Sequence, residues 1–296
     1  MPINLEVIDT FDFHLAPVYA LAEDEGQLYS AGGDRKIIRY QKQDGQFIAE
    51  PFAETTESTF ALHVCDHLLY SGGIDGNLNV FDVQEKLILN RFQCHGMGIY
   101  AIESNDEFVI TGGGDGKIHL WDKKNLVIAR TIWTGSSKIR KFIWDANKTE
   151  MACIDNEGNF RIFETKWWNE TYTTKHVTGW NSGFYHPLKK VWVLGSKSGE
   201  IVVYQQSNTK PLLNIQAHLN AIYCLIWEKE KQILVSGSLD KSIKIWDDHT
   251  LDLLNRVDKL NGVALRSVNA LINWNGHLAI AGDDKKIHIT KICFFE

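Results

Sequence analysis

The stretch Ile-Thr-Gly-Gly-Gly-Asp-Gly-Lys-Ile-His-Leu-Trp-Asp occupies residues 110–122, and it returns as Val-Ser-Gly-Ser-Leu-Asp-Lys-Ser-Ile-Lys-Ile-Trp-Asp at residues 235–247. Weaker copies bring the total to seven, with a period of about 41 residues. The aromatic residue that closes the phrase lies at Tyr40, Phe81, Trp121, Phe163, Tyr204 and Trp246, and Thr290 takes its place in the last copy. A fixed period of this length predicts a repeat architecture in which each copy is one structural unit.

Two further columns keep the same register. Three residues before the closing position stands an apolar residue, at Ile37, Leu78, Ile118, Phe160, Ile201, Ile243 and Ile287. Six residues before it stands an acid, at Asp34, Asp75, Asp115, Glu157, Asp240 and Asp284, with Ser198 as the exception. Successive closing positions lie 40 to 44 residues apart, so no unit carries a large insertion.

Within each unit the periodicity is typical of strands. Residues 117–121 and 242–246 alternate polar and apolar side chains, which places one side of each segment in the interior. The glycine-rich and Asp-containing runs before them predict tight hairpin turns, because glycine tolerates positive φ. Further short apolar segments lie upstream, as at 99–102, and downstream, as at 126–132. Four strands in each of seven units predict a radial array of small antiparallel sheets.

The phrase, its period and its closing Trp-Asp resemble the WD40 family of β-propellers, and the resemblance extends over residues 1–296. It implies an all-β, seven-bladed propeller of four-stranded antiparallel blades in a single domain. Residues 4–11 resemble the fourth strand of a unit and precede the first complete copy. We therefore expect this N-terminal segment to complete the last blade, as is common in WD40 proteins.

Composition narrows the class of protein. The 296 residues contain no run of about 18 apolar residues, the length typical of a membrane span, and the N-terminus lacks the pattern of a secretory signal. Five cysteines, an odd number spread over different units, favour reduced thiols and a cytoplasmic location. A net charge of −6 argues against nucleic acid as a partner. The basic stretch 138–141 favours a solvated strand edge over a surface for an acidic partner.

Ser, Thr, His and Asp recur in a pattern that a hydrolase triad would also use. An enzyme needs one such set, whereas this chain repeats it at similar offsets in three units. The resemblance implies instead a buried hydrogen-bonded chain in each unit, formed by His14, Ser30, Asp34 and Tyr40, by His95, Thr111, Asp115 and Trp121, and by His218, Ser236, Asp240 and Trp246. Units two and four lack several members, so we expect packing to stabilise them.

Other candidate chemistry is weak. The glycine-rich run 112–117 lacks the Gly-Lys-Ser/Thr of a phosphate-binding loop, and the histidines and cysteines lack zinc-site spacing. The sequence thus predicts no cofactor, no metal and no catalytic residue. Adjacent Trp167 and Trp168, expected on the outer strand of unit four, must face opposite ways. Packing against the next blade is favoured for them over a partner anchor.

The resemblance implies protein or peptide binding at the end of the ring that carries the hairpin before each closing strand, hereafter the hairpin end. Carried over by register, the candidate partner-binding residues are Ile74, Leu239, Lys138, Lys197, Asn156 and Asp283. The leading hypothesis is a non-catalytic scaffold, either a monomeric propeller or a subunit of a complex, with an unidentified protein or peptide as its partner. The alternatives are a lactonase- or hydrolase-type propeller with a metal in the central channel, and a sensor of small ligands.

Overall fold

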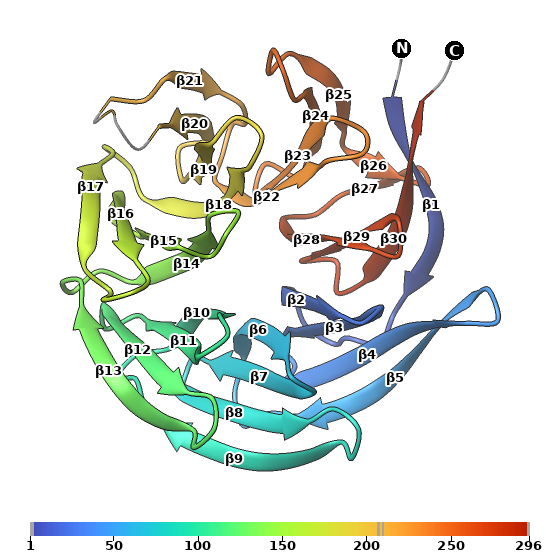
Figure 1. Cartoon of the computed structure of the whole chain (residues 1–296). Coiled ribbons are helices and arrows are strands. Elements are labelled where there is room, and N and C mark those ends of the chain that lie inside the picture. The colour runs from blue at the N-terminus through green and yellow to red at the C-terminus, as the bar shows by residue number, and fades with distance from the viewer. Residues whose placement is uncertain (1–2, 206–207, 209, 295–296) are drawn as a thin grey trace.

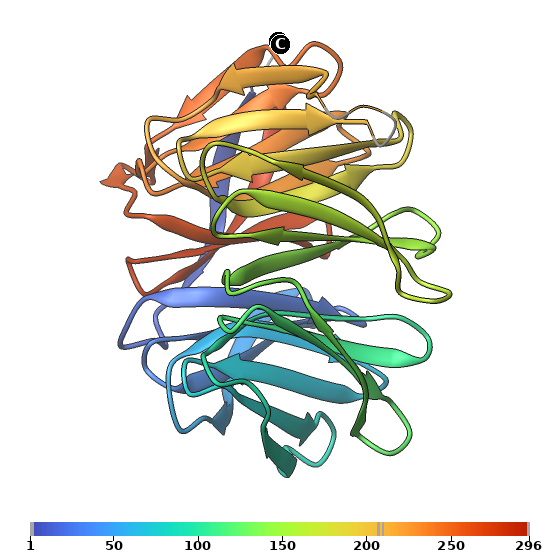
Figure 2. The same cartoon turned by 90° about the vertical axis from the view of Figure 1, so that its left-hand side faces the viewer.

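The computed structural model describes residues 3–205, 208 and 210–294, and every regular element in those ranges is a β-strand. The strands form seven antiparallel four-stranded sheets and one small hairpin, and the sheets are arranged around a central axis (Figure 1). A side view shows the sheets standing next to one another, with their connecting turns at the two ends of the ring (Figure 2). The seven-bladed propeller expected from the repeats is confirmed.

Each of the first three blades contains four strands that are consecutive in sequence. Blade 1 consists of β2 (Val18–Asp24), β3 (Gln27–Gly32), β4 (Lys36–Gln43) and β5 (Gln46–Glu54). Blade 2 consists of β6 (Thr59–Cys65), β7 (Leu68–Gly73), β8 (Asn77–Asp82) and β9 (Leu87–Gln93). Blade 3 consists of β10 (Ile99–Ser104), β11 (Phe108–Gly113), β12 (Lys117–Asp122) and β13 (Val127–Trp133).

The next three blades repeat this plan, with the first strand innermost. Blade 4 consists of β14 (Ile139–Trp144), β15 (Glu150–Asp155), β16 (Asn159–Glu164) and β17 (Glu170–Lys175). Blade 5 consists of β18 (Trp180–His186), β19 (Val191–Ser196), β20 (Glu200–Tyr204) and β21 (Leu213–Gln216). Blade 6 consists of β22 (Ile222–Glu228), β23 (Ile233–Ser238), β24 (Ile243–Asp247) and β25 (Leu253–Val257).

Blade 7 closes the ring with strands from both ends of the described chain. It contains β28 (Val268–Trp274), β29 (His277–Gly282) and β30 (Ile287–Phe294), and β1 (Ile3–Phe11) supplies its outer strand. The antiparallel register runs from Ile3 opposite Phe294 to Phe11 opposite Ile287. The predicted closing strand is therefore confirmed. The small hairpin of β26 (Lys259–Leu260) and β27 (Val263–Ala264) precedes this blade, which explains why the last repeat is the longest.

The hairpin turns need glycine at particular positions. Gly116, between β11 and β12, has a φ of +72°, and a Cβ built on it would lie 1.8 Å from the carbonyl oxygen of Gly135. A side chain cannot be accommodated there without moving the backbone, so the repeated glycine has a steric cause.

The apolar core is divided among the seven interfaces between neighbouring blades. Each of the seven hydrophobic clusters takes its buried members from two adjacent blades, as when Ile118 of β12 packs with Phe142 of β14. A single small sheet cannot bury both faces alone, so each blade depends on its neighbours for its core.

The sequence predicted that Trp167 and Trp168 lie on the outer strand of blade 4. In the structure they precede β17 and lie in the turn before it. Trp168 is 5% exposed and packs edge-on against Trp144 and against Phe108 of blade 3. The expectation that it packs against the next blade is wrong, because the turn directs it to the preceding one. Trp167 is 64% exposed.

Candidate functional site at the centre of the ring

Each innermost strand carries a β-bulge at the same place. In all seven, the register shifts between the first and third residues of the strand, so the second residue has no partner in the ladder. A bulge commonly re-aims its side chain away from the sheet. The seven bulge residues all line one central cavity; they are Tyr19, Phe60, Tyr100, Arg140, Asn181, Tyr223 and Asn269.

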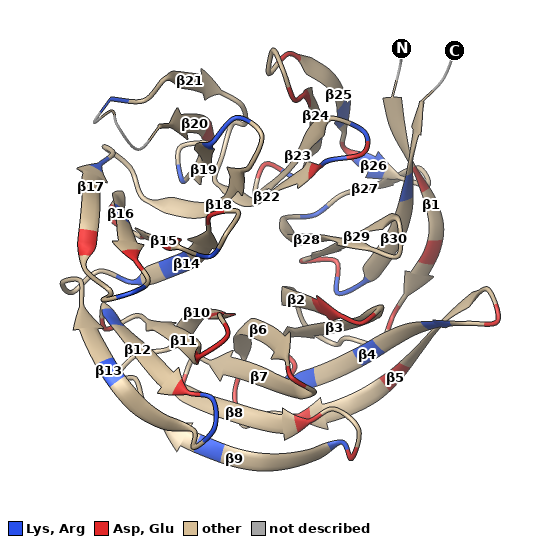
Figure 3. Ribbon diagram, in the orientation of Figure 1, with Lys and Arg blue, Asp and Glu red and all other residues tan. Residues whose placement is uncertain are grey.

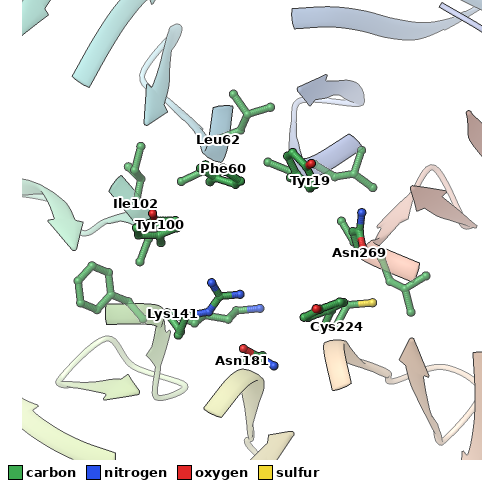
Figure 4. A pocket seen from close by; sticks show the side chains of 18 of the residues that line it. Tyr19, Phe60, Leu62, Tyr100, Ile102, Lys141, Asn181, Cys224 and Asn269 are labelled. Carbon is green, nitrogen blue, oxygen red and sulfur yellow. The ribbon is translucent and has the colours of Figure 1, made fainter. Parts of the chain in front are cut away.

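The cavity has a volume of about 660 Å³, within the range of small-molecule and side-chain binding pockets. Figure 4 shows the labelled side chains converging on it from all sides of the ring. The third residue of the innermost strand is small in six blades, at Ala20, Ala61, Ala101, Ser182, Cys224 and Ala270. In blade 4 this residue is Lys141, which extends into the middle of the cavity (Figure 4).

One wall of the cavity is aromatic. The ring centroids of Tyr19 and Phe60 lie 5.1 Å apart, and those of Phe60 and Tyr100 lie 5.2 Å apart, so the three rings form a continuous arc. At its end, Lys138 Nζ lies 4.0 Å from the centroid of Tyr100, and Arg140 Cζ lies 5.9 Å from it. The arc therefore meets the basic wall through cation–π contacts.

The adjoining wall is basic, because Lys138, Arg140 and Lys141 all come from β14 or the residue before it. Figure 3 shows this basic segment of β14 beside the centre of the ring. Burial lowers the pKa of Arg140, and the electrostatic effects of Tyr223 and Tyr100 act in the other direction. Burial also lowers the pKa of Lys141, and there the electrostatic effects of Glu103 and Cys224 act in the other direction. Lys197, in the turn after β19, has its pKa lowered by burial and then by the charges of Arg140 and Lys138.

Two carboxylates also line the cavity. Asp283, in the turn between β29 and β30, accepts a hydrogen bond of 2.9 Å from Asn269 Nδ2. Glu103 near the end of β10 lies 3.9 Å from His63 Nδ1. The cavity therefore has its three lining cations on blade 4 or the residue before it, and its two acids on blades 3 and 7.

The structure brings together four of the six residues predicted to bind a partner. Ile74, Leu239, Lys138 and Asp283 border the cavity at the hairpin end, and Ile74 and Leu239 are 50% and 41% exposed. Asn156 and Lys197 do not line it, although the Asn156 backbone N–H donates to the carbonyl of Lys138 at 2.9 Å. The role of all six residues in binding stays a prediction.

Sequence reasoning missed the bulge residues. The six predicted residues include no Tyr or Arg, yet three tyrosines and Arg140 line the same cavity wall. The available signal was their shared position, one residue into each innermost strand. Residues 138–141 do lie on or beside an edge strand, as expected, but this edge faces the central cavity, which the sequence did not predict.

The three predicted hydrogen-bonded chains are present and lie within blades 1, 3 and 6. In blade 3, His95 Nδ1 lies 2.9 Å from Asp115 Oδ1, His95 Nε2 lies 2.9 Å from Thr111 Oγ1, and Trp121 Nε1 donates to Thr111 Oγ1 at 3.1 Å. Blade 6 has the same chain through His218, Asp240, Ser236 and Trp246, and blade 1 has it through His14, Asp34, Ser30 and the hydroxyl of Tyr40. Removing one member leaves a buried partner unpaired, at a cost of about 1–3 kcal/mol.

Burial also sets the charge state of these chains. It lowers the pKa of His95, although the hydrogen bond and charge of Asp115 act against it. Burial alone would raise the pKa of Asp115, but hydrogen bonds from His95 and Gly96 outweigh it and hold the pKa below its usual value. Neutral histidine and ionised aspartate are thus favoured, which suits a structural role.

Blades 2 and 4 have polar networks of their own, in addition to the packing that is expected to be their main source of stability. In blade 4 the fully buried Asp155 accepts from Asn159 Nδ2 at 2.6 Å and pairs with Arg161 at 3.2 Å. In blade 2 Asn79 Nδ2 donates to Ser71 Oγ at 3.1 Å. Different residues thus satisfy the buried polar groups at the corresponding places.

Within the described ranges, no group of three or more His, Cys, Asp or Glu side chains is arranged to hold a metal ion. The cavity offers cations, two carboxylates, aromatic rings and amides.

Comparisons with known proteins agree with the repeats. The family model described as "WD domain, G-beta repeat" matches residues 86–122 and 209–247, which contain the two best copies of the phrase. The chain is 21% identical over 237 residues to eukaryotic translation initiation factor 3 subunit I of Bombyx mori, covering 75% of this chain and 71% of that protein. It is 21% identical over 189 residues to THO complex subunit 3 of Arabidopsis thaliana, covering 64% and 59%. It is also 16% identical over 235 residues to pre-mRNA-processing factor 19 of Oryza sativa subsp. japonica, covering 77% and 44%.

Proposed function

This chain belongs to the WD40-repeat family of β-propellers, and from that premise we propose that it is a non-catalytic scaffold that binds a segment of a partner protein at the hairpin end. The observation that carries the proposal is the mouth of the central cavity. Two apolar side chains, Ile74 and Leu239, stand exposed at its border, above a wall of aromatic rings. Exposed apolar and aromatic groups around a concavity are typical of an anchor site for a partner.

The names of two relatives support this proposal. One is called a subunit of a translation initiation factor and the other a subunit of the THO complex. Both names describe parts of larger assemblies. Membership of an assembly is therefore proposed for this chain as well, without transfer of either relative's own partners.

The proposal places the protein in the cytoplasm. The five cysteines are free thiols, which supports a reducing compartment. No helix in the described part of the chain is long and apolar enough to span a membrane.

Affinity capture from a lysate of the source cells, read by mass spectrometry, tests the proposal. The bait is the wild type, the double variant Ile74→Glu/Leu239→Glu, or the matched control Leu87→Glu/Leu188→Glu, whose leucines are exposed away from the cavity. We expect a protein enriched by the wild type and the control but lost with the first variant, because a buried carboxylate at the border is costly to desolvate. The enriched protein is then purified and its direct binding measured.

Equal loss with both double variants would contradict binding at the hairpin end. Enrichment of no protein by the folded wild type would contradict the scaffold proposal and favour a small ligand in the cavity.

A further inference from the structure

The inner strand of blade 4 departs from the other six in three positions at once. Lys138 stands where the other blades have Pro17, Ser58, Gly98, Gly179, Ala221 and Ser267. Arg140 is the one cation among the seven bulge residues, and Lys141 is the one cation among the seven third residues. All three side chains line the same cavity. One wall of a ring built otherwise from small, aromatic and amide side chains thus carries three positive charges.

These cations form no close ion pair in the part of the chain that the structure describes, although the charge of Glu103 favours the charged form of Lys141. None of Lys138, Arg140 and Lys141 forms a salt bridge there, and Arg140 Nε is buried without a hydrogen-bond acceptor. The neighbouring Asn181 is 7% exposed, and its Nδ2 also lacks a partner. Figure 4 shows Asn181 at the edge of the same space as Lys141. Buried donors and cations without acceptors are costly, and arginine remains charged even when buried.

The other walls of the cavity favour a ligand that carries an apolar group next to its anionic group. The arc of Tyr19, Phe60 and Tyr100 is uncharged, and it extends around the cavity from Tyr100, beside Lys141, to Tyr19 (Figure 4). Of the two acids of the cavity, Asp283 accepts a hydrogen bond from Asn269, whereas Glu103 lies 3.9 Å from His63 and its charge also acts on Lys141. A ligand group beside Arg140 therefore meets hydrogen-bond donors and positive charge, while the adjacent part of the ligand meets aromatic rings.

We propose that the cavity recognises an anionic side chain of the partner, a carboxylate or a phosphate, bound by Arg140, Lys141 and Asn181. An aromatic or aliphatic group next to the anion packs on the arc of Tyr19, Phe60 and Tyr100. This inference rests on the proposed function and adds the chemistry of the bound segment. Arc-forming aromatic residues can also bind cations, but here Lys138 already covers the end of the arc at 4.0 Å from Tyr100.

Calorimetric titration of the full chain with defined probes tests this chemistry. The probes are phenyl phosphate, inorganic phosphate, benzyl alcohol, benzyltrimethylammonium, and a five-residue peptide made in three forms that carry glutamate, glutamine or phosphoserine between two phenylalanines. We expect the acidic peptides and phenyl phosphate to bind, inorganic phosphate to bind more weakly, and the neutral and cationic probes not to bind. A preference for benzyltrimethylammonium, or heat with none of the anionic probes, overturns the inference.

Three variants locate the bound anion. Arg140→Gln removes the charge and keeps donors, and Lys141→Ala introduces the residue that blades 1, 2, 3 and 7 carry at this position. Lys124→Gln removes an exposed cation from the turn between β12 and β13 as a control. Loss of a charge-assisted hydrogen bond should weaken binding of the acidic probes about tenfold or more in the first two variants and leave the control unchanged. Circular dichroism melting curves verify that all three fold, and equal affinities in all three overturn the inference.

The same variants separate this inference from the proposed function. If the captured partner is lost with Ile74→Glu/Leu239→Glu but retained by Arg140→Gln and Lys141→Ala, the scaffold stands and the anionic side chain is overturned. If phenyl phosphate binds through Arg140 but no acidic peptide and no protein binds, the site belongs to a small anion, and the assignment to a partner's side chain is overturned.

Discussion

Individual histidines are kept neutral by burial in this fold. His95 and His119 stack with ring centroids 4.5 Å apart in blade 3, and His119 bonds Thr131 at 2.8 Å and the carbonyl of Cys94 at 3.0 Å. Burial, followed by the nearby charge of His95, lowers the pKa of His119 to about 4. Protonating either ring would place a positive charge in a buried site beside the other imidazole.

The stability of the protein should therefore decrease in mild acid. The unfolded chain protonates His119 near its usual pKa of 6.5, whereas the folded chain protonates it only near 4, so its contribution is complete above pH 6.5 and is lost as the pH falls through this window. We expect His119→Asn, which introduces the residue that blade 2 has at Asn79, to reduce the loss of stability between pH 7 and pH 4.5. One proton corresponds to at most about 1.4 kcal/mol per pH unit.

Urea unfolding at several pH values measures this slope, with exposed His249→Asn as the control. Identical slopes for the wild type and His119→Asn would contradict the assignment.

Among the elements, β1 closes the ring, because it pairs with β30 and so brings the two ends of the described chain into one sheet. Its residues alternate in burial, and Ile3 and Leu5 are 3% and 6% exposed within the cluster between blades 6 and 7. Beyond Val7 the register shifts, and the residue at this shift, Ile8, is 46% exposed.

Truncating Leu5 and truncating Ile8 should thus have unequal effects on stability. Leu5→Ala is expected to lower the free energy of unfolding by about 2–5 kcal/mol, because it leaves a cavity between two blades. Ile8→Ala removes a similar side chain from an exposed position and should cost less than about 1 kcal/mol. Equilibrium denaturation compares the two, and a cost for Leu5→Ala no larger than for Ile8→Ala would show that β1 contributes little to closure.

For the molecule as a whole, the seven interfaces are equivalent in kind. Each holds one apolar cluster, and blade 7 differs from the other blades only in that its outer strand, β1, comes from the other end of the described chain. Ile3 and Phe294 are paired across the sheet, so the two ends of the described chain lie side by side (Figure 1).

A circular permutant should therefore fold. Residues 1 and 296 are joined by a short glycine–serine linker, and the chain is opened between Asp44 and Gly45, in an exposed turn with positive φ at both residues. The strand β5 then closes blade 1 as β1 closes blade 7, and we expect a melting temperature within a few degrees of the wild type.

Opening the chain between Tyr29 and Ser30 cuts a fully buried strand and serves as the contrasting permutant. If both permutants fold equally well, position in the ring does not decide where the chain can be opened.

Much of this architecture follows from local pattern alone. The closing aromatics, the acids six residues before them and the alternating strands repeat in the chain, so each unit predicts its own sheet and turn. The recurrence of His95, Thr111 and Asp115 as His218, Ser236 and Asp240 at similar offsets argued for a structural role, and the resemblance to the WD40 family implied that these residues form hydrogen-bonded chains. The closing strand was predictable because residues 4–11 have the alternation of a fourth strand without the other three before them.

The cavity could be identified only from the tertiary structure of the closed ring. In the sequence, Tyr100 and Arg140 are ordinary members of an apolar and a basic segment. The direction of their side chains depends on a bulge that shifts the register by one residue. A one-residue shift reverses which face a side chain occupies, so a period of two cannot place it. Seven such bulges meet at one centre only when all seven blades close. Local periodicity therefore determined the blades and their number, whereas packing between residues far apart in the chain determined that Arg140, Lys141 and Asn181 share one cavity.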